Sequence, residues 1–324
     1  MRRTRTNPSP SKPTQNIYDT PSFFSAYSTL PRAQQGLTGA SEWPDIRLLL
    51  PKDLTGMSVL DLGCGDGWFS RWAIDSGASS VLALDGSANM LSRARELSSS
   101  SEVYAGIDYR QVDMVTLSLE RDSFDLIFSG LALHYPPDLR LILSKLHASL
   151  KPGGSFVFSV EHPVYTAPQQ PGFQHAPDTG RVYWPLTDYF DESPRCVSWL
   201  GSRVRKQHHM VQTWIGAVLD AGFGLTGLLE WGGTREGEEG RKHPDWEEGV
   251  SPRFMILSAR RTWGRGVRRQ GTTGLSRKGT MEGGKMMMER TKTMERERTM
   301  DRSRLGRVVS WARRGVKPRK IGIL

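Results

Sequence analysis

Short apolar runs alternate with amphipathic stretches between residues 58 and 160. Most of the runs are followed by glycine or aspartate, which is typical of buried parallel strands. The stretches between them carry apolar side chains on one helical face, as Met90, Ala94 and Leu97 illustrate. The predicted strands are 58–62, 80–84, 109–112, 124–128 and 155–160, and the predicted helices are 68–75, 88–97 and 139–150. Strands that alternate with helices indicate βαβ crossovers and a parallel sheet covered on both faces.

Further elements extend this unit on both sides. Apolar and aromatic residues at helical spacing begin at Ser22, and a second helix is expected over 42–50, where Pro51 ends it. The later elements are a helix over 210–221, strands over 223–231 and 254–259, and an acidic, glycine-rich loop over 232–249. The predicted fold class is therefore α/β, with a doubly wound, mostly parallel seven-stranded sheet.

Residues 162–206 break the periodic pattern. They are rich in proline, glycine and aromatic side chains and contain no repeat. A stretch of this length without periodic structure inside a compact domain is usually functional. Because it begins where the strand over 155–160 ends, we expect it to form an irregular lid over the carboxyl edge of the sheet. Its aromatic side chains could exclude water there and stack on a flat or apolar ligand.

Two terminal segments have the composition of disordered chain. Residues 1–17 are mostly proline, serine, threonine and arginine, and residues 262–324 are low in complexity, with Met-Glu-Arg repeated. Such segments bury too little apolar surface to offset the entropy of folding. We therefore expect one folded domain over 18–261, including the lid insert, between disordered segments at 1–17 and 262–324.

The net charge of +10 comes from the C-terminal segment. Residues 262–324 contain 18 Lys and Arg and 5 Asp and Glu, a net charge of +13, and the other 26 basic and 29 acidic residues give −3. Because the domain itself is mildly acidic, nucleic-acid binding by the folded part is not expected. The basic tail leaves open an electrostatic contact with an acidic partner such as RNA.

Cysteine usage and hydropathy exclude several other classes of protein. Cys64 and Cys196 are too few for a disulfide framework or a four-ligand zinc site, so no metal is expected. No run of ~18 apolar residues exists, so no membrane span is predicted. The basic N-terminus continues into prolines, unlike a secretory signal. A cytoplasmic location is the default expectation, and the absence of acidic residues from 1–18 leaves a mitochondrial presequence as an alternative.

A glycine loop follows the first predicted strand. Residues 61–67 read DLGCGDG, and glycines at alternate positions allow a tight turn and the close approach of a ligand. The dinucleotide fingerprint would require glycine where Trp68 stands, and the phosphate-loop signature is absent. The loop therefore favours a cofactor other than NAD or a nucleoside triphosphate.

Acidic residues also follow the next two strands. Asp85, followed by Gly86, lies about 20 residues beyond the glycine loop, where a carboxylate can accept both hydroxyls of a ribose. Asp113 precedes Met114, so that a carboxylate could accept from an adenine amine while an apolar side chain packs on the ring. Because ligands of open parallel sheets bind beyond the carboxyl ends of the strands, we expect Asp61, Asp85 and Asp113 to share one site with the loop.

Four segments are distributed along the predicted sheet: VLDLGCGDGWF (59–69), VLALDGSANML (81–91), FDLIFS and the residues to 135, and LKPGGSFVFSVEHP (150–163). In this order they resemble the first, second and fourth motifs and the region of the fifth strand of class I S-adenosylmethionine-dependent methyltransferases, most closely the type 11 subgroup. The resemblance covers about residues 20–260. It implies the class I fold and a methyltransferase that uses S-adenosyl-L-methionine.

The resemblance also implies a role for each residue of the loop and the strand ends. Cys64 is expected to fill space and not to act as a redox group. The residues that would contact the cofactor are Asp61, Gly63, Cys64 and Gly65 at its amino-acid end, Asp85 and Gly86 at the ribose, Asp113 and Met114 at the adenine, and Ser129 beside the sulfonium.

Candidates for the acceptor side follow the fourth and fifth strands. Methyl transfer from a sulfonium needs in-line positioning, exclusion of water and, for a hydroxyl or an acidic carbon, a base. The catalytic candidates are His134, Glu161 and His162, each with the alternative of only shaping the pocket. Tyr27 and Arg32 could close the cofactor side. The Asn/Asp-Pro-Pro-Tyr tetrad of amino-group methylases is absent, which disfavours adenine and cytosine as acceptors.

The leading hypothesis is an enzyme that methylates a small-molecule acceptor. One alternative is a methyltransferase of RNA or protein that uses the basic tail as an anchor. Another is a non-catalytic partner subunit that binds the cofactor. The intact glycine loop and the three acidic residues Asp61, Asp85 and Asp113 argue against this second alternative. The sequence predicts no particular oligomeric state.

Overall fold

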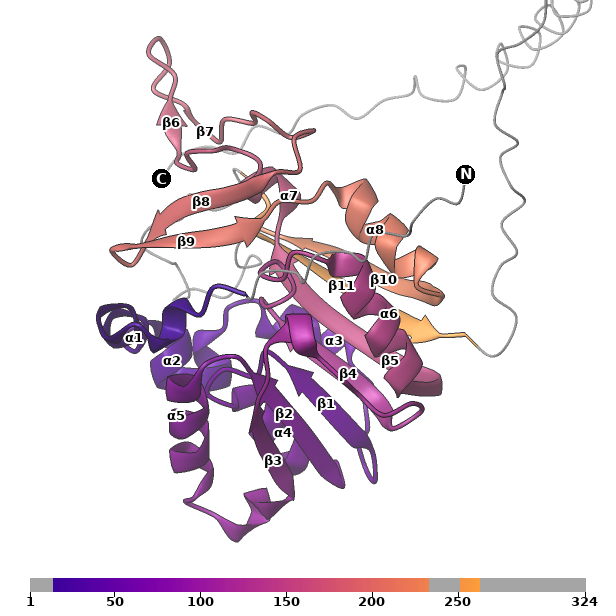
Figure 1. Cartoon of the computed structure of the whole chain (residues 1–324). Helices are drawn as coiled ribbons and strands as arrows, with labels where there is room; N and C mark the ends of the chain where they lie inside the picture. Colours follow the sequence, from indigo (N-terminus) through magenta and orange to yellow (C-terminus); the bar gives the residue numbers. More distant parts are fainter. Residues whose placement is uncertain (1–13, 233–250, 263–324) are drawn as a thin grey trace, which may run out of the picture. The chain divides into compact units, whose positions relative to one another are not determined.

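The computed structural model describes residues 14–232 and 251–262 (Figure 1). The strands of its main sheet are β1 (Ser58–Leu62), β2 (Ser80–Asp85), β3 (Ile107–Gln111), β4 (Phe124–Gly130), β5 (Leu150–Glu161), β10 (Phe223–Trp231) and β11 (Phe254–Arg261). They lie in the order β10-β11-β5-β4-β1-β2-β3. Strands β1 to β5 pair in parallel, and β11 is antiparallel to both of its neighbours. The predicted doubly wound, mostly parallel seven-stranded sheet is confirmed.

Helices cover both faces of this sheet. The α-helices are α1 (Pro21–Tyr27), α2 (Pro31–Gln35), α3 (Trp43–Leu49), α4 (Trp68–Asp75), α5 (Ala88–Ser98), α6 (Leu139–Ser149), α7 (Pro163–Thr166) and α8 (Val211–Asp220). Short 3₁₀ turns are η1 (Ile17–Asp19), η2 (Gly36–Gly39), η3 (Glu102–Gly106) and η4 (Met114–Thr116). Buried side chains of α6 and α8 pack in one core layer, and those of α3, α4 and α5 pack in the other.

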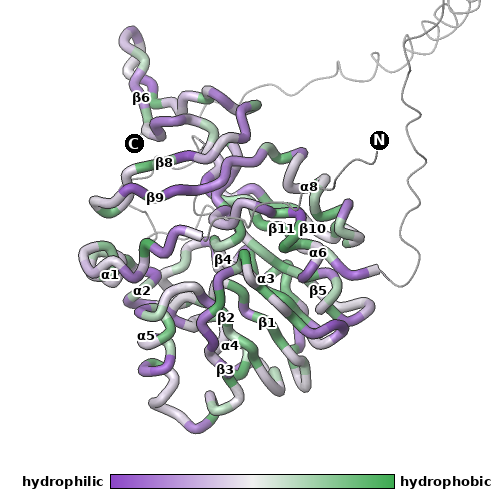
Figure 2. The backbone as a smooth tube through the Cα atoms, viewed as in Figure 1, coloured by the Kyte–Doolittle hydropathy of each residue, from purple (hydrophilic) through white to green (hydrophobic). Residues whose placement is uncertain are grey.

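The central strands supply both core layers because successive side chains of a strand point to opposite faces. On β1, Leu60 belongs to the layer under α6 and α8, whereas Val59 belongs to the layer under α3 to α5. Phe156 and Val157 of β5 divide in the same way. Burying such a side chain contributes about 1.5–3 kcal/mol. Figure 2 accordingly shows the most hydrophobic stretches along the central strands.

Strand β5 is longer at its start than predicted. It begins at Leu150, which pairs with Phe124, and the pairing shifts register before Leu126 meets Ser155. Gly153 adopts φ 81°, a left-handed conformation that glycine takes without strain. The residues between the helix predicted over 139–150 and the strand predicted over 155–160 are therefore an irregularity inside the strand.

The prediction that residues 162–206 lack periodic structure is wrong. Besides α7, they contain the two-residue strands β6 (Gln174–His175) and β7 (Val182–Tyr183) and a longer hairpin of β8 (Pro194–Trp199) and β9 (Ser202–Gln207). The hairpin turns at Leu200 (φ 49°) and Gly201 (φ 74°), the positive values of a tight two-residue turn. The turn was missed because Leu200 stands where asparagine or aspartate is usual. The strands were missed because the buried cations Arg195 and Lys206 interrupt the alternation of apolar and polar residues.

The described chain begins inside the segment that was expected to be disordered. Thr14 hydrogen-bonds to Asp113 and Asn16 to the Gly86 carbonyl, so residues 14–17 belong to the folded part. Residues 1–13, 233–250 and 263–324 lie outside the described residues, and what was predicted for the tail and for most of the acidic loop stays a prediction. In the described part of the chain, every helix is too short or too polar to cross a bilayer.

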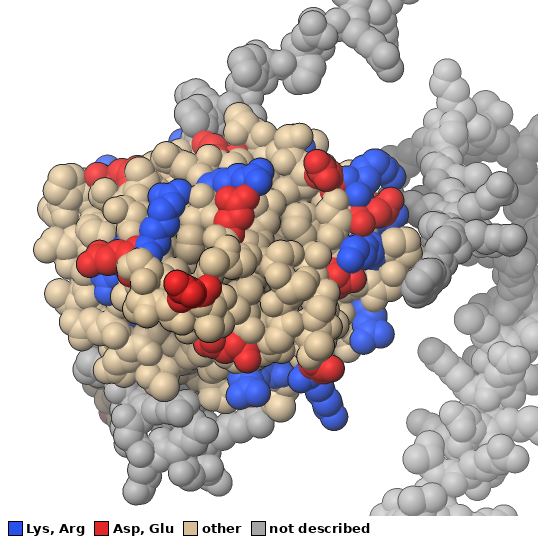
Figure 3. All heavy atoms as spheres, turned by 90° about the horizontal axis from the view of Figure 1, so that it is seen from below, with Lys and Arg blue, Asp and Glu red and all other residues tan. Residues whose placement is uncertain are grey.

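Charges on the described domain are of mixed sign. On the face drawn in Figure 3, acidic and basic side chains lie interspersed among neutral ones. Such a mixture produces no strong field of one sign. This agrees with the location of the positive net charge in residues 262–324, as the sequence indicates.

Candidate active site

A pocket of about 990 Å³ opens beyond the carboxyl ends of β1, β2, β4 and β5. This is the edge at which ligands of open parallel sheets bind. The N-terminal segment and the insert after β5 supply the rest of its wall. The lining residues used below are Thr14, Tyr18, Tyr27, Arg32, Gly63, Asp85, Gly86, Asp113, Met114, His134, Tyr135, Glu161, Tyr165, Arg195, Trp199, Lys206 and Arg253.

The glycine loop is packed too tightly for larger residues. Gly63, Gly65 and Gly67 have φ values of 75°, 56° and 76°, all left-handed. A Cβ on Gly63 would lie 2.3 Å from the Ala132 Cβ. Gly63 lines the pocket, and its amide donates to the Leu84 carbonyl, which ties the loop to β2. The loop therefore brings bare backbone to the pocket wall at the ends of β1 and β2.

Cys64 and Gly65 lie behind the pocket wall. Burial raises the pKa of the Cys64 thiol well above its ordinary value, and the side chain is 5% exposed. A thiol held protonated in this way is not a nucleophile. The Gly65 amide donates to Asp85 Oδ2. Both residues therefore support the loop from behind the pocket wall. This agrees with the expectation that Cys64 fills space and does not act as a redox group.

Asp61 and Ser129 are not on the pocket wall either. Asp61 is 1% exposed and accepts a hydrogen bond from Ser70 Oγ at 2.6 Å, and Ser129 Oγ donates to the Leu62 carbonyl at 2.7 Å. The structure therefore does not support the cofactor contacts expected of these side chains. Because their polar atoms bond within the fold, they hold the strand ends that carry the loop.

Asp61 makes a test of this packing possible. Burial raises the pKa of its carboxyl to about 7, so the folded protein keeps a proton that the unfolded chain releases near pH 4. The contribution of Asp61 to the free energy of unfolding is therefore fully present below about pH 4, and it is lost as the pH rises through about 7. We expect the free energy of unfolding of Asp61→Asn, relative to wild type, to increase by about 2–4 kcal/mol from pH 4 to pH 8 in urea titrations. Asp108→Asn, at an exposed carboxyl, is the control, and a pH-independent difference for Asp61→Asn would contradict the assignment.

Asp85 lies at the end of β2, between the loop and the start of α5. Its Oδ2 accepts from the Gly65 amide and its Oδ1 from the Ser87 amide, both at 2.8 Å. Burial raises the pKa of this carboxyl, against the lowering by the two amides. A carboxylate has about four acceptor sites, so two remain for ligand hydroxyls. The neighbouring Gly86 also lines the pocket.

Asp113 accepts hydrogen bonds from the N-terminal segment. Thr14 donates to both carboxylate oxygens, through its amide at 2.9 Å and its hydroxyl at 2.7 Å. The Val115 amide takes a third acceptor site at 3.0 Å. Met114 lines the pocket beside it. One acceptor site of Asp113 therefore remains beside an apolar side chain.

Sequence reasoning missed the hydrogen bonds by which Asp19 fixes the N-terminal segment to α5. Asp19 accepts from Ser87 Oγ at 2.6 Å and from the amides of Asn89 and Ala88, at the N-terminus of α5. Burial raises the pKa of Asp19, but these hydrogen bonds outweigh it and hold the pKa below its ordinary value. A carboxylate at a helix N-terminus is also favoured by the helix dipole. The only sequence feature that marks Asp19 is its acidic side chain next to Tyr18 at an otherwise apolar helix start. This feature does not reveal that Asp19 binds the N-terminus of α5.

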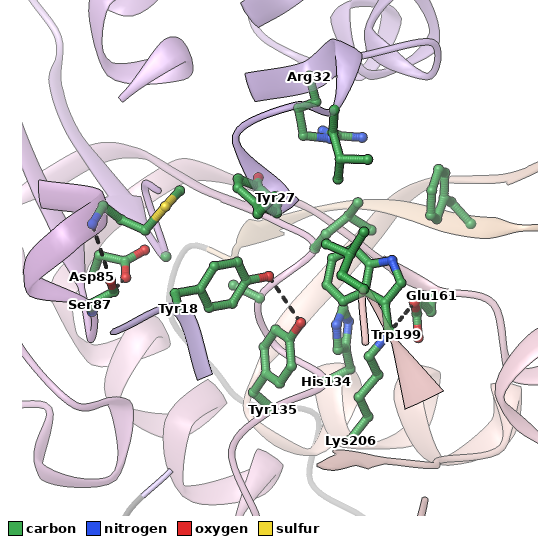
Figure 4. Close-up of a pocket in the computed structure, with 18 of the residues that line it drawn as sticks. Tyr18, Tyr27, Arg32, Asp85, Ser87, His134, Tyr135, Glu161, Trp199 and Lys206 are labelled. Atoms are coloured by element: carbon green, nitrogen blue, oxygen red, sulfur yellow. Dashed lines mark hydrogen bonds and ion pairs between the residues drawn. The ribbon is translucent and has the colours of Figure 1, made fainter. Parts of the chain in front are cut away.

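The N-terminal segment closes one side of the pocket. Tyr27 and Arg32 line it, as the sequence suggested, and Arg32 pairs with the buried Glu42 at 2.5 Å. Tyr18 reaches the hydroxyl of Tyr135, with 3.2 Å between the two oxygens. Figure 4 shows this hydroxyl pair between Asp85 on one side and His134 and Glu161 on the other.

His134 and Glu161 lie at the opposite end of the pocket from Asp85 (Figure 4). His134 is 3% exposed, and no described group hydrogen-bonds its Nδ1. Burial lowers the pKa of His134 to about 4, which leaves the imidazole neutral. Burial raises the pKa of Glu161, but the Lys206 ammonium at 2.6 Å outweighs this and lowers the net value. This end therefore presents a neutral base and an ionised carboxylate.

His162, the third catalytic candidate, does not reach the pocket. Its Nδ1 accepts from the Val164 amide and caps α7, and its Nε2 lies 2.8 Å from Glu230 Oε1. Both ring nitrogens are thus used within the fold, and the side chain is 1% exposed. We correct the assignment, since His162 fixes the path of the chain after β5.

The insert after β5 supplies the remaining wall of this end. Tyr165 of α7, Trp199 of β8 and Lys206 of β9 line the pocket. Arg195 anchors the insert, because its guanidinium donates to the carbonyls of Ala167, Ser193, Asp188 and Asp191. Sequence reasoning did not single out Lys206 or Arg253, although the pattern of β9 points Val204 and Lys206 to the same side.

Comparisons with known proteins bear on this site. A family described as a methyltransferase domain matches residues 60–158. A crystal structure of an S-adenosylmethionine-dependent methyltransferase from Mesorhizobium loti shares 43% sequence identity, with a TM-score of 0.64. The likeness covers 70% of this chain and 100% of that one.

Two named enzymes match over shorter stretches. Malonyl-[acyl-carrier protein] O-methyltransferase of Erwinia billingiae is 40% identical over 105 residues, which are 32% of this chain and 39% of that enzyme. Demethylmenaquinone methyltransferase of Lactococcus lactis is 37% identical over 118 residues, 35% of this chain and 45% of that enzyme. The chain thus spans less than half of the length of these two relatives. The likeness to the Mesorhizobium loti methyltransferase extends over all of that chain at 43% sequence identity, and this chain belongs to the S-adenosylmethionine-dependent methyltransferases.

Proposed function

We propose that this methyltransferase transfers the methyl group of S-adenosylmethionine to a small-molecule acceptor. The observation that carries the proposal is a single pocket of about 990 Å³ with carboxylates at one end and a neutral imidazole at the other. Ligand pockets usually measure about 300–1,000 Å³, so this one has room for the cofactor and a small acceptor together. Two relatives named for a malonyl group and for demethylmenaquinone support an acceptor of this kind.

The residues at the cofactor end fit S-adenosylmethionine, which supplies an activated methyl group. Asp85 retains two acceptor sites for ribose hydroxyls, and Asp113 retains one beside Met114, as an adenine amine requires. The Gly63 backbone leaves space that a Cβ would fill. We assign Asp85 and Gly86 to the ribose, Asp113 and Met114 to the adenine, and Gly63 to the amino-acid end.

The residues at the acceptor end position the nucleophile and handle its proton. His134 is neutral above about pH 4 and can accept a proton from a hydroxyl or an acidic carbon. Glu161 pairs with Lys206 and fixes the ammonium at the pocket wall. We assign His134 as the base and Glu161 as the residue that positions Lys206. The insert acts as the lid that excludes water.

The ribose assignment leads to a binding prediction. Asp85→Ala is expected to weaken S-adenosylmethionine binding by about 1–3 kcal/mol, because buried hydroxyls lose a charged acceptor. Isothermal titration calorimetry measures this directly, with Asp108→Ala on β3 as a control for loss of an exposed carboxylate. Wild-type affinity in Asp85→Ala would exclude the ribose contact.

Mass-shift profiling tests the proposed function itself. The purified full-length protein is incubated with S-adenosylmethionine and a metabolite extract, and products heavier by one methyl group are sought by mass spectrometry. We expect at least one small metabolite to be methylated. Methyl transfer to RNA or protein alone, lost when the chain is truncated after Arg261, would favour the alternative in which the basic tail anchors an acidic macromolecule. The cytoplasmic location stays a prediction.

A further inference from the structure

The segment before α1 is hydrogen-bonded to the cofactor end of the pocket. We call residues 14–19 the N-terminal strap, and its pocket-lining members are Thr14, Gln15, Asn16 and Tyr18. Thr14 donates to both carboxylate oxygens of Asp113, and Asn16 donates to the Gly86 carbonyl at 3.2 Å. In an extended chain, neighbouring side chains point to opposite sides. The side chain between Thr14 and Asn16 accordingly leaves the cofactor end and turns to the β8–β9 hairpin.

Gln15 binds the edge of β9 in the manner of a neighbouring strand. Its Nε2 donates to the Arg203 carbonyl at 2.9 Å, and its Oε1 accepts from the Arg205 amide at 2.7 Å. Backbone groups two residues apart on a strand face the same edge, and a side-chain amide has both the donor and the acceptor that such an edge requires. The other edge of β9 pairs with β8. One residue of the strap therefore fixes the hairpin at two backbone positions.

The same edge of β9 also reaches His134. The Gln207 amide, two residues beyond Arg205, donates to the His134 carbonyl at 2.7 Å. Lys206 of the pocket wall lies between these two points of attachment. Gln15 and the His134 backbone thus hold successive positions of the strand that carries Lys206. A movement of the strap would therefore move the wall of the acceptor end.

These contacts connect the two ends of the pocket through one side chain. Two hydrogen bonds of a partly exposed glutamine add little net stability in water, so this attachment can open locally. Asp113 keeps an acceptor site while Thr14 is bonded to it, so the cofactor can bind there with the strap in place. Contacts with the pocket-lining strap would then favour the attached state, since a ligand shifts an equilibrium toward the state that it binds better.

We propose that Gln15 is a positioning residue, through which cofactor binding at the ends of β2 and β3 fixes the β8–β9 hairpin at the acceptor end. The bound cofactor would thereby complete the wall that holds the acceptor before the methyl group is transferred. This inference rests on the proposed function, which places the cofactor at Gly86 and Asp113 and the acceptor beside Trp199 and Lys206.

Hydrogen exchange of the full-length protein tests this coupling. The reporter is the Gln207 amide, because its hydrogen bond runs to the His134 carbonyl and not to Gln15. S-adenosylhomocysteine, at a concentration that calorimetry shows to be saturating for each protein, should slow this exchange at least about fivefold in the wild type. In Gln15→Ala the ligand should change the rate by less than about twofold. Gln212→Ala, which removes an exposed glutamine of α8, should respond like the wild type.

The ratio of the exchange rates with and without ligand distinguishes coupling from mere support. If Gln15 only supported the hairpin, Gln15→Ala would raise both rates and keep the wild-type ratio, which would overturn the inference. A wild-type rate that does not respond to bound S-adenosylhomocysteine would overturn it as well, and so would loss of ligand binding by Gln15→Ala, because Gln15 would then belong to the cofactor site. None of these results contradicts the proposed function. A wild type that does not bind S-adenosylhomocysteine would contradict both.

Steady-state kinetics with the acceptor found by profiling adds a second readout. Gln15→Ala should raise the KM for the acceptor at least about fivefold and lower kcat by a smaller factor, because the acceptor wall is less firmly fixed whereas His134 is unchanged. A loss confined to kcat would contradict a positioning role at the acceptor wall.

Discussion

Replacing His134 with alanine is expected to lower kcat for the acceptor by about 10²–10⁴-fold, the usual contribution of a general base. The Kd of S-adenosylmethionine should stay within about twofold, because His134 lies at the acceptor end and acts on the transition state. Steady-state kinetics with the acceptor found by profiling, together with calorimetry for the cofactor, measures both quantities. The pH profile adds a second readout. Because burial lowers the pKa of His134 to about 4, activity should fall on the acid side near pH 4 and not near pH 6.5.

Two variants make the result for His134 specific. His162→Ala removes a histidine that is close in the sequence but bonded within the fold, so it should reduce stability more than the rate of the chemical step. Glu161→Gln keeps the size of the side chain and removes the charge that fixes Lys206, so KM should change more than kcat. A loss of less than about fivefold in kcat for His134→Ala would mean that positioning alone carries the reaction.

Gly63→Ala is expected to have the second large effect, a loss of cofactor affinity of at least about a hundredfold together with a lower melting temperature. Gly63 has φ 75°, where an alanine costs roughly 1–2 kcal/mol. Its Cβ would also lie 2.3 Å from the Ala132 Cβ, so the loop or the segment after β4 must move. Both segments line the cofactor end of the pocket.

Gly56→Ala separates the two causes. Gly56 has φ 73°, nearly the same backbone conformation, but an added Cβ would meet nothing within 4 Å. It should therefore show the conformational cost alone and keep wild-type cofactor affinity. If Gly63→Ala and Gly56→Ala lower stability equally and both bind S-adenosylmethionine normally, the close packing of the glycine loop does not matter for binding.

The cofactor end was predictable because its determinants are local in the sequence. A buried strand, its glycine loop and the next acidic strand end fall within residues 58–86, and the alternation of strands with helices fixes where they meet. The same locality misled the assignment of Asp61 and Ser129. Their positions follow the pattern, but their side chains turn to Ser70 and to the Leu62 carbonyl, which no spacing reveals.

The acceptor end was harder to predict because distant segments build it. Glu161 meets Lys206 across 45 residues. At the cofactor end, the contact between Thr14 and Asp113 across 99 residues was missed for the same reason. Such pairings depend on how the insert and the N-terminal segment fold back onto the sheet. His162 shows the remaining difficulty, since a histidine before a proline reads equally well as a base or as a helix cap, and the hydrogen bond from the Val164 amide shows the second role.

In the proposed function, the β8–β9 hairpin places acceptor recognition on a part of the chain outside the segment that matches the methyltransferase domain. The match to the methyltransferase domain spans residues 60–158 and ends before the insert begins, whereas Trp199 and Lys206 of the hairpin line the acceptor end. The hairpin is joined to the rest of the domain by Arg195, by the ion pair of Lys206 with Glu161, and by hydrogen bonds of Gln15 to the backbone of Arg203 and Arg205. Substitutions on the hairpin are therefore expected to alter acceptor binding without altering the glycine loop and the ends of β1 and β2, which hold the methyl donor in the proposed function.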